Sequence, residues 1–155
     1  MSVPAVNSAH QRARATLSHT YSRTGQPSVA DAAAPRNLLE RYVRAWEASD
    51  VAGLVALLRE DAVLTMPPKP VVAGATQIGD FLANSIFPIA PMRLLEAHAN
   101  ASPAFAAYMR EPSGDRFAAF ALLVIAGDGQ KISQIAAFSD PRVFARFGLP
   151  AEMAF

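Results

Sequence analysis

The sequence predicts an α+β fold in which three helices pack on a curved, mostly antiparallel sheet. Between residues 37 and 88, apolar side chains recur at the three- and four-residue steps of amphipathic helices, with one short extended segment among them. From residue 92 onwards, extended apolar segments alternate with turn residues, which is typical of an antiparallel meander. A block of helices followed by a block of strands indicates that the helices cover one face of the sheet.

The part of the chain before this domain divides into two expected segments. Residues 1–17 predict a short basic helix. Residues 18–36 are rich in Ser, Thr, Gly, Pro and Ala, and so predict a flexible linker. Four arginines and one aspartate lie in residues 1–36, so this end is basic in a chain whose formal net charge is +1. The basic side chains could contact phosphates, and the folded domain is expected to span residues 37–155.

Capping residues and one apolar face mark the first two helices. Asn37 can cap the first helix, and Glu40 can reach back to it as in a capping box. The apolar residues of this helix share one face: Leu39, Tyr42, Val43 and Trp46. Asp50 can cap a second helix that follows almost without a loop. The two helices should therefore form a compact corner.

A short strand and a third helix are expected next. Residues 62–66 are apolar or β-branched, and Pro67-Pro68 ends this strand because proline cannot donate to a strand ladder. Thr76 can cap the third helix, and Pro88 closes it.

Four further strands and a final short helix complete the domain. The strands are expected at residues 92–101, 104–111, 117–126 and 130–139. Turn residues at 112–115 and 127–129 suit tight hairpins. Asp140 precedes Pro141 and can cap a helix over residues 142–147, so its carboxylate has a structural explanation.

The composition excludes several classes of site. The chain has no cysteine, which excludes disulfides, thiolate metal sites and cysteine nucleophiles. Its three histidines, His10, His19 and His98, are not spaced for a shared metal, so we expect no metal site. The sequence has no phosphate-binding loop and no dinucleotide fingerprint, so we expect no cofactor. It also has no membrane-spanning run and no export signal, and we expect a cytoplasmic protein with no membrane partner.

Three residues are candidates for acid-base catalysis: His98, Asp61 and Tyr108. The pKa of a histidine is close to neutrality, so His98 could act as a base. Glu96, His98 and Asn100 share one strand face, and the pattern leaves open whether this face meets a pocket or solvent. Asp61 could equally be a structural carboxylate at a helix-strand boundary, and Tyr108 could place its ring in the core.

Several segments carry a resemblance to a known family. They are Ala45-Trp46-Glu47 in the first helix, residues 57–68, the Ala99-Asn100 step before Pro103, and residues 138–150. These segments resemble the SnoaL-like C-terminal domain of extracytoplasmic-function (ECF) sigma factors, over nearly all of residues 38–153. Residues 6–17 independently resemble the last helix of sigma region 4. The chain departs from the family at Ala101-Ser102, where Gly-Gln is expected, and at Phe120, where a polar residue is expected.

The resemblance implies a fold and a set of partners. The fold would be the cone shared by nuclear transport factor 2 (NTF2), ketosteroid isomerase and the SnoaL-like cyclases. The domain would regulate transcription initiation by contacting sigma regions 2 and 4 or RNA polymerase, and residues 138–155 are a plausible contact strip. Promoter DNA would be bound only by the intact parent protein, through side chains near the N-terminus: Asn7, Ser8, Gln11, Arg12 and Arg14.

A cone would also bring apolar side chains from each major element around a possible pocket for a small hydrophobic ligand. The candidates are Tyr42, Trp46, Met66, Phe81, Phe87, Phe105, Tyr108 and Phe138, with Asn100 as a polar anchor. The same side chains could instead simply fill the core.

Two alternatives to the regulatory function remain open. One is a cofactor-independent cyclase or isomerase, or a small-molecule binding protein. It would need a carboxylate or histidine inside the cone. The other is a homodimerisation module, which is compatible with either function. We expect contact rather than catalysis.

Overall fold

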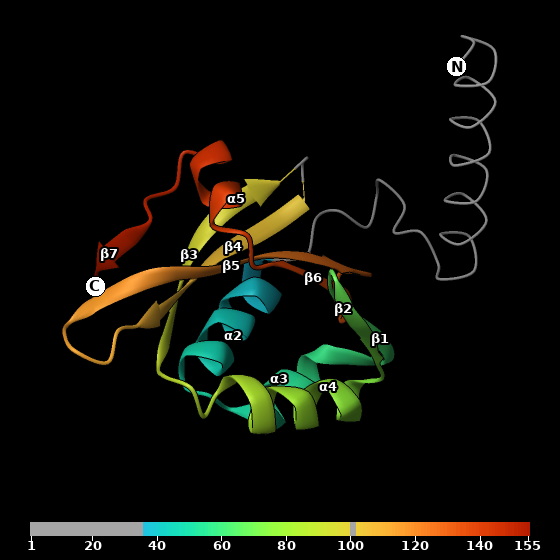
Figure 1. Cartoon of the computed structure of the whole chain (residues 1–155). Helices are drawn as coiled ribbons and strands as arrows, with labels where there is room; N and C mark the ends of the chain where they lie inside the picture. The colour runs from blue at the N-terminus through green and yellow to red at the C-terminus, as the bar shows by residue number, and fades with distance from the viewer. Residues whose placement is uncertain (1–35, 100–101) are drawn as a thin grey trace, which may run out of the picture.

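The computed structural model describes residues 36–99 and 102–155 and has the predicted α+β architecture (Figure 1). In chain order its elements are α2 (Arg36–Glu47), α3 (Val51–Leu57), β1 (Leu58–Met66), β2 (Lys69–Ala73), α4 (Ala75–Phe81), the π-helix η2 (Leu82–Ile86), β3 (Met92–Ala99), β4 (Ser102–Arg110), β5 (Arg116–Gly127), β6 (Ile132–Phe138), α5 (Pro141–Arg146) and β7 (Glu152–Ala154). The expected basic helix and nearly all of the expected linker lie outside the described residues.

One curved sheet organises the domain. Its strands run in the order β2-β1-β6-β5-β4-β3, and β7 pairs with the beginning of β5. Within the described residues, the β1–β6 pair is parallel and the other strand pairs are antiparallel. The sheet is therefore mostly antiparallel, as the sequence predicted. Helices α2, α3 and α4 lie against one face of the sheet, and α5 lies on the other side (Figure 1).

The corner between the first two helices forms largely as expected. Asp50 caps α3, and its Oδ1 accepts a hydrogen bond from the Gly53 N–H at 2.9 Å. Ser49 adopts a left-handed conformation with φ of 53°, which allows the chain to reverse between α2 and α3. The predicted cap at Asn37 is wrong. Because α2 already includes Arg36, Asn37 lies inside its first turn.

The segment between the second and third predicted helices differs most from expectation. Strand β1 begins at Leu58, directly after α3, rather than at residue 62. Strand β2 was not predicted. It contains Pro70, lies at the sheet edge and is almost entirely exposed, so it lacks the alternation that marks a buried strand. Helix α4 begins after Gly74, so Thr76 lies in its first turn and is not its cap.

The C-terminal half follows the prediction closely. Strands β3 to β6 match the four expected segments to within a few residues. Asp140 caps α5 by accepting a hydrogen bond from the Arg142 N–H at 2.9 Å, as the sequence predicted. Strand β7 was not predicted because it has only three residues, of which two are exposed.

The sheet separates two regions of packing. The inner core lies between the sheet and helices α2 to α4, and its larger buried side chains include Tyr42, Trp46, Leu54, Ile78, Phe105 and Ile125. The outer core lies on the opposite face, where α5 and the C-terminal segment cover the sheet. It is centred on Ala106, Tyr108, Phe117 and Phe144, and a smaller cluster of Ala99, Ala104 and Leu122 lies beside it on the same face.

Candidate functional site

The inner face of α2 supplies the aromatic centre of the inner core. Tyr42 and Trp46 are four residues apart, so they lie on the same face of the helix, and both are buried. Their ring centroids are 5.8 Å apart. Phe105 of β4 lies 5.7 Å from the ring of Tyr42, and Phe87, which follows η2, lies 5.4 Å from the ring of Trp46. We call these four residues the α2 aromatic cluster.

Two polar atoms of this cluster are buried without a partner among residues 36–99 and 102–155. In these ranges neither Tyr42 Oη nor Trp46 Nε1 has a hydrogen-bonding partner. Burial raises the pKa of the Tyr42 hydroxyl above its ordinary value, so the phenol stays protonated. Buried polar atoms are nearly always hydrogen-bonded, and these two exceptions lie on one helix face. They are the most unusual chemical feature of the inner core.

Six of the nine predicted pocket residues meet in this region. Met66 and Phe81 are half-buried and pack against the inner core, as does Phe87, while Tyr42, Trp46 and Phe105 are part of it. Asn100, the predicted polar anchor, lies outside the described residues.

Tyr108 and Phe138 lie elsewhere. Side chains alternate along β4, so Phe105 and Ala107 face the inner core whereas Tyr108 faces the outer core. The Tyr108 hydroxyl donates a hydrogen bond to the Pro150 carbonyl at 3.0 Å. Phe138 ends β6, follows the inward-facing Ala137 and is 40% exposed.

Phe120, one of the two positions at which the sequence departs from the family, contacts the inner core. In the β4–β5 ladder, Ala107 pairs with Ala121 but Tyr108 pairs with Ala119, so Phe120 is the extra residue of a β-bulge. The bulge lets Phe120 pack against the inner core together with its neighbour Ala121. Sequence reasoning singled out Phe120 as a departure but did not include it among the pocket residues.

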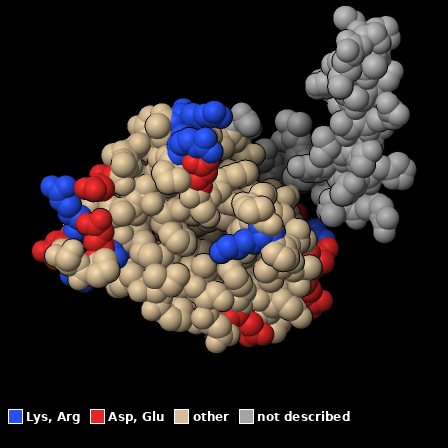
Figure 2. All heavy atoms as spheres, viewed as in Figure 1, with Lys and Arg blue, Asp and Glu red and all other residues tan. Residues whose placement is uncertain are grey.

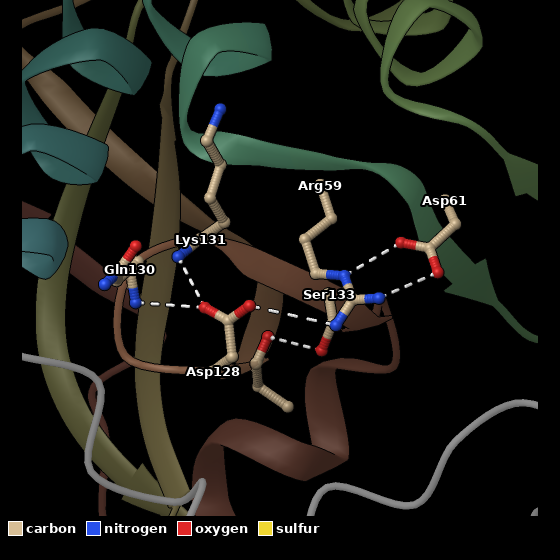
Figure 3. A network of polar contacts seen from close by, with 7 residues as sticks. Arg59, Asp61, Asp128, Gln130, Lys131 and Ser133 are labelled. Atoms are coloured by element: carbon tan, nitrogen blue, oxygen red, sulfur yellow. Dashed lines mark hydrogen bonds and ion pairs between the residues drawn. The ribbon is translucent and has the colours of Figure 1, made fainter.

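Asp61 belongs to a surface network (Figure 3). The Arg59 guanidinium donates to both Asp61 carboxylate oxygens, at 2.9 and 3.0 Å, and lies 3.8 Å from Asp128. These hydrogen bonds hold the pKa of the Asp61 carboxyl below its ordinary value. The Asp61 side chain is 71% exposed, so this carboxylate is ionised in solvent rather than enclosed in the cone.

His98 and Glu96 are exposed on the edge strand β3. They alternate with Leu95 and Ala97, which pack on the outer face, so their side chains leave the strand on the same side as Leu94 of the inner core. Helix α2 meets this strand through Glu47, whose carboxylate accepts from the Leu94 N–H at 3.1 Å. The polar pair on β3 therefore lies in solvent beyond this contact.

A separate surface groove of about 430 Å³ involves none of the predicted site residues. It lies between the residues before β3 and the β4–β5 hairpin and is lined by Ile89, Ala90, Pro91, Arg110, Glu111, Pro112, Gly114 and Asp115. Its Arg110 is already paired with Asp115 at 3.1 Å. No group of His, Asp and Glu residues suited to a metal occurs in the described parts of the chain. No helix described here is long and apolar enough to cross a membrane.

The sequence is similar to that of a sigma factor. The ECF RNA polymerase sigma factor SigG of Mycobacterium tuberculosis is 39% identical over 158 aligned positions, which cover 96% of this chain and 41% of SigG. The chain thus spans less than half the length of the curated relatives that it matches.

Solved structures support the cone fold. An NTF2-like protein from Burkholderia xenovorans has a TM-score of 0.55 at 13% identity, covering 72% of this chain and 91% of that protein. A protein with a ketosteroid isomerase-like fold from Catenulispora acidiphila has a TM-score of 0.51 at 16% identity, covering 75% of this chain and 95% of the other. Residues 39–135 match the family described as the SnoaL-like domain. The cone geometry and this match over more than half the sequence place the chain in the SnoaL-like domain family.

Proposed function

We propose that this chain is the regulatory C-terminal part of an ECF sigma factor, and that it modulates transcription initiation by contacting sigma regions or RNA polymerase. The observation that carries the proposal is the similarity to SigG, which extends over 96% of the chain rather than over the SnoaL-like domain alone. Residues 1–17 would then be the end of region 4, and promoter contacts would belong to the intact parent protein.

The arrangement of the candidate catalytic groups favours contact over catalysis. An isomerase of this fold needs a base and a hydrogen-bond donor facing one apolar site. Asp61 and His98 are exposed, and Tyr108 donates to Pro150 on the other side of the sheet. None of the three meets the α2 aromatic cluster.

The proposed contact strip, residues 138–155, presents some of its aromatic side chains to solvent. Phe147 is 42% exposed and Phe155 is 54% exposed. Phe144, by contrast, is buried in the outer core, and Met153 is half-buried against it. Phe138, at the start of the strip, is 40% exposed. We therefore assign the contact to Phe138, Phe147 and Phe155, and assign a structural role to Phe144.

The contact can be tested by measuring the affinity of the chain for RNA polymerase carrying sigma regions 2 and 4. Phe147→Asp should weaken binding at least tenfold, because an apolar contact is replaced by a charge. Val71→Asp is the matched control, since Val71 is exposed on β2, outside the strip. Absence of binding, or equal loss in both variants, would contradict the proposal.

A second candidate function is the binding of a small hydrophobic ligand in the inner core. It is favoured by the meeting of six predicted pocket residues in the inner core, four of which form the α2 aromatic cluster. Such a ligand would give the regulatory domain a signal to respond to. Binding of an apolar hydrocarbon or ketone to the isolated chain tests this function directly.

A further inference from the structure

The two ends of the sheet are protected to different degrees. Within the described residues, β2 lies at one end of the strand order and β3 at the other. The outer edge of such a strand carries unpaired backbone groups that can pair with another chain, and lysine or proline on the edge discourages this pairing. Strand β2 has both, at Lys69 and Pro70. Strand β3 has neither along its eight residues, so its edge is the more open one.

Backbone geometry shows which groups of β3 face outward. The Arg110 N–H of β4 donates to the Pro91 carbonyl at 2.9 Å, directly before β3 begins. Because the direction of hydrogen bonding alternates along a strand, every second residue of β3 from Leu94 onward directs its N–H and C=O away from β4. The hydrogen bond from the Leu94 N–H to Glu47 agrees with this direction and closes the edge at that point.

Beyond Glu47, the outward-facing residues are Glu96 and His98. Both are exposed, and no described strand pairs with this side of them. The Glu96 carboxylate can accept a hydrogen bond, and the His98 imidazole can donate one. They are two positions apart, so an antiparallel copy of β3 centred on Ala97 places Glu96 of each copy opposite His98 of the other. The two neighbouring registers, centred on Glu96 or on His98, place like side chains opposite each other. The edge is therefore complementary to itself in the register centred on Ala97.

We propose that two copies of this chain associate by antiparallel pairing of their β3 strands across a two-fold axis at Ala97. Each Glu96–His98 pair then exchanges two backbone hydrogen bonds, in addition to the contact between the side chains. Ala97 pairs with Ala104 and lies on the outer face of the sheet, and its small side chain leaves room for the second strand at the axis. The inference concerns self-association and does not depend on the proposed role in transcription.

The charge of the molecule permits a second copy to approach. The formal net charge is only +1. On the face of the molecule shown in Figure 2, the charged side chains lie in small separate groups, and uncharged residues predominate between them. Since no extended patch of one sign lies on that face, long-range repulsion between two copies is weak.

Sedimentation equilibrium of the complete chain over a wide range of concentration tests the pairing. We expect a reversible equilibrium between monomer and dimer, whose dissociation constant rises about tenfold in His98→Glu because carboxylates then face each other at both pairs. Adding Glu96→His to this variant exchanges the two side chains and should restore the dissociation constant. Glu60→His is the control, since it makes the same change at an exposed residue of β1 and should leave the constant unchanged. A monomer at every concentration, or a dimer that the exchange does not restore, would overturn the proposal.

Hydrogen exchange locates the interface. Exchange at the Glu96 and His98 amides should be fast in the monomer and should become about tenfold slower as the dimer forms, because only the second copy supplies their acceptors. The Ala97 amide faces β4 and should show little dependence on concentration. His98→Pro removes an outward N–H but no bond to β4, so it should abolish dimerisation while the chain stays folded. Slow exchange at both amides in the monomer would show that another segment covers the edge, and fast exchange in the dimer would show that another surface pairs. Either result would overturn the proposal.

Discussion

Two tyrosine hydroxyls, buried on opposite sides of one sheet, make opposite contributions to stability. Tyr108 Oη donates to the Pro150 carbonyl and so ties the C-terminal segment to β4, whereas Tyr42 Oη has no partner in the part of the chain that the structure describes. A satisfied buried hydroxyl stabilises a fold modestly, while an unsatisfied one carries a desolvation cost. Removing each hydroxyl in turn therefore compares the effects of a satisfied and an unsatisfied buried hydroxyl on the free energy of unfolding.

We predict that Tyr108→Phe lowers the free energy of unfolding by about 1–2 kcal/mol, because the Pro150 carbonyl loses its donor. Tyr42→Phe should leave the free energy of unfolding unchanged or raise it. Urea denaturation of the three proteins without ligand measures both effects. A loss of stability in Tyr42→Phe as large as that in Tyr108→Phe would show that Tyr42 is hydrogen-bonded after all.

A second prediction concerns Asp140. Hydrogen bonds from the Arg142 side chain lower the pKa of the Asp140 carboxyl to about 2. A lowered pKa in the folded state means that the interaction stabilises the fold above the ordinary carboxyl pKa and is lost as the pH falls toward 2. Arg142→Gln should therefore raise the Asp140 pKa and reduce stability at pH 5 much more than at pH 2.

An NMR titration of the Asp140 carboxyl carbon measures this shift. Arg146→Gln is the control, because Arg146 contributes only a weaker charge interaction and should change the pKa less. A larger shift in Arg146→Gln than in Arg142→Gln would refute the assignment.

The periodicity of the sequence already shows that the predicted pocket residues do not all lie on one face of the sheet. The helical spacing of Tyr42 and Trp46 correctly placed both on one buried face. Tyr108 is three positions from Phe105 on a strand, so alternation alone separates their faces. The position of Phe120 depends on a β-bulge, and no local pattern in the sequence marks that bulge.

At the element scale, the β5–β6 hairpin depends on Asp128. Its Oδ1 accepts from the backbone N–H groups of Gln130 and Lys131 at 3.0 and 2.8 Å, and its other oxygen faces Arg59. Lys131 Nζ in turn donates to the Ala56 carbonyl at the end of α3. This network holds the turn beside the start of the parallel β1–β6 pair (Figure 3).

We predict that Asp128→Ala lowers the urea midpoint more than Arg59→Gln does. The first variant frees two backbone donors, whereas the second removes only exposed ion pairs, which contribute little to stability. Asp128→Asn retains an acceptor for the turn and should remain close to the unsubstituted protein. The reverse order for Asp128→Ala and Arg59→Gln would mean that the ion pairs, and not the turn, stabilise this junction.

Helix α2 also protects the sheet edge. Glu47 accepts a hydrogen bond from the Leu94 N–H of the edge strand β3 and pairs with Arg93 at 3.2 Å. We predict that Glu47→Ala increases hydrogen exchange at the Leu94 amide about tenfold, because its acceptor is lost. Glu47→Gln keeps an oxygen acceptor and should show a smaller increase. Unchanged exchange in Glu47→Ala would argue against this edge contact.

The elements that the sequence missed share a physical cause. Strand β2 and strand β7 are short and mostly exposed, so their existence depends on a neighbouring strand rather than on an apolar pattern of their own. The caps that were predicted correctly, Asp50 and Asp140, act through local side-chain to backbone bonds. Local chemistry was therefore easier to predict than pairing at sheet edges.

On the scale of the whole molecule, the order of helices and strands was enough to predict a curved sheet with helices on one face. It did not predict that α5 and β7 would build a second core on the other face, centred on Tyr108, Phe117 and Phe144. This outer core joins the C-terminal strip to the sheet, so deleting residues 138–155 would remove β7, α5 and part of a core together. Substitutions of exposed residues in the strip therefore test the contact with the partner without removing part of the core.

We propose that the domain modulates transcription initiation by contact. The most direct test of this proposal is single-round transcription by RNA polymerase carrying sigma regions 2 and 4, with and without the complete chain, and with its Phe147→Asp and Val71→Asp variants. We expect the chain to change the amount of transcript, Phe147→Asp to abolish this change, and Val71→Asp to preserve it. Identical transcript amounts with and without the chain would show that the domain does not act on initiation by contact.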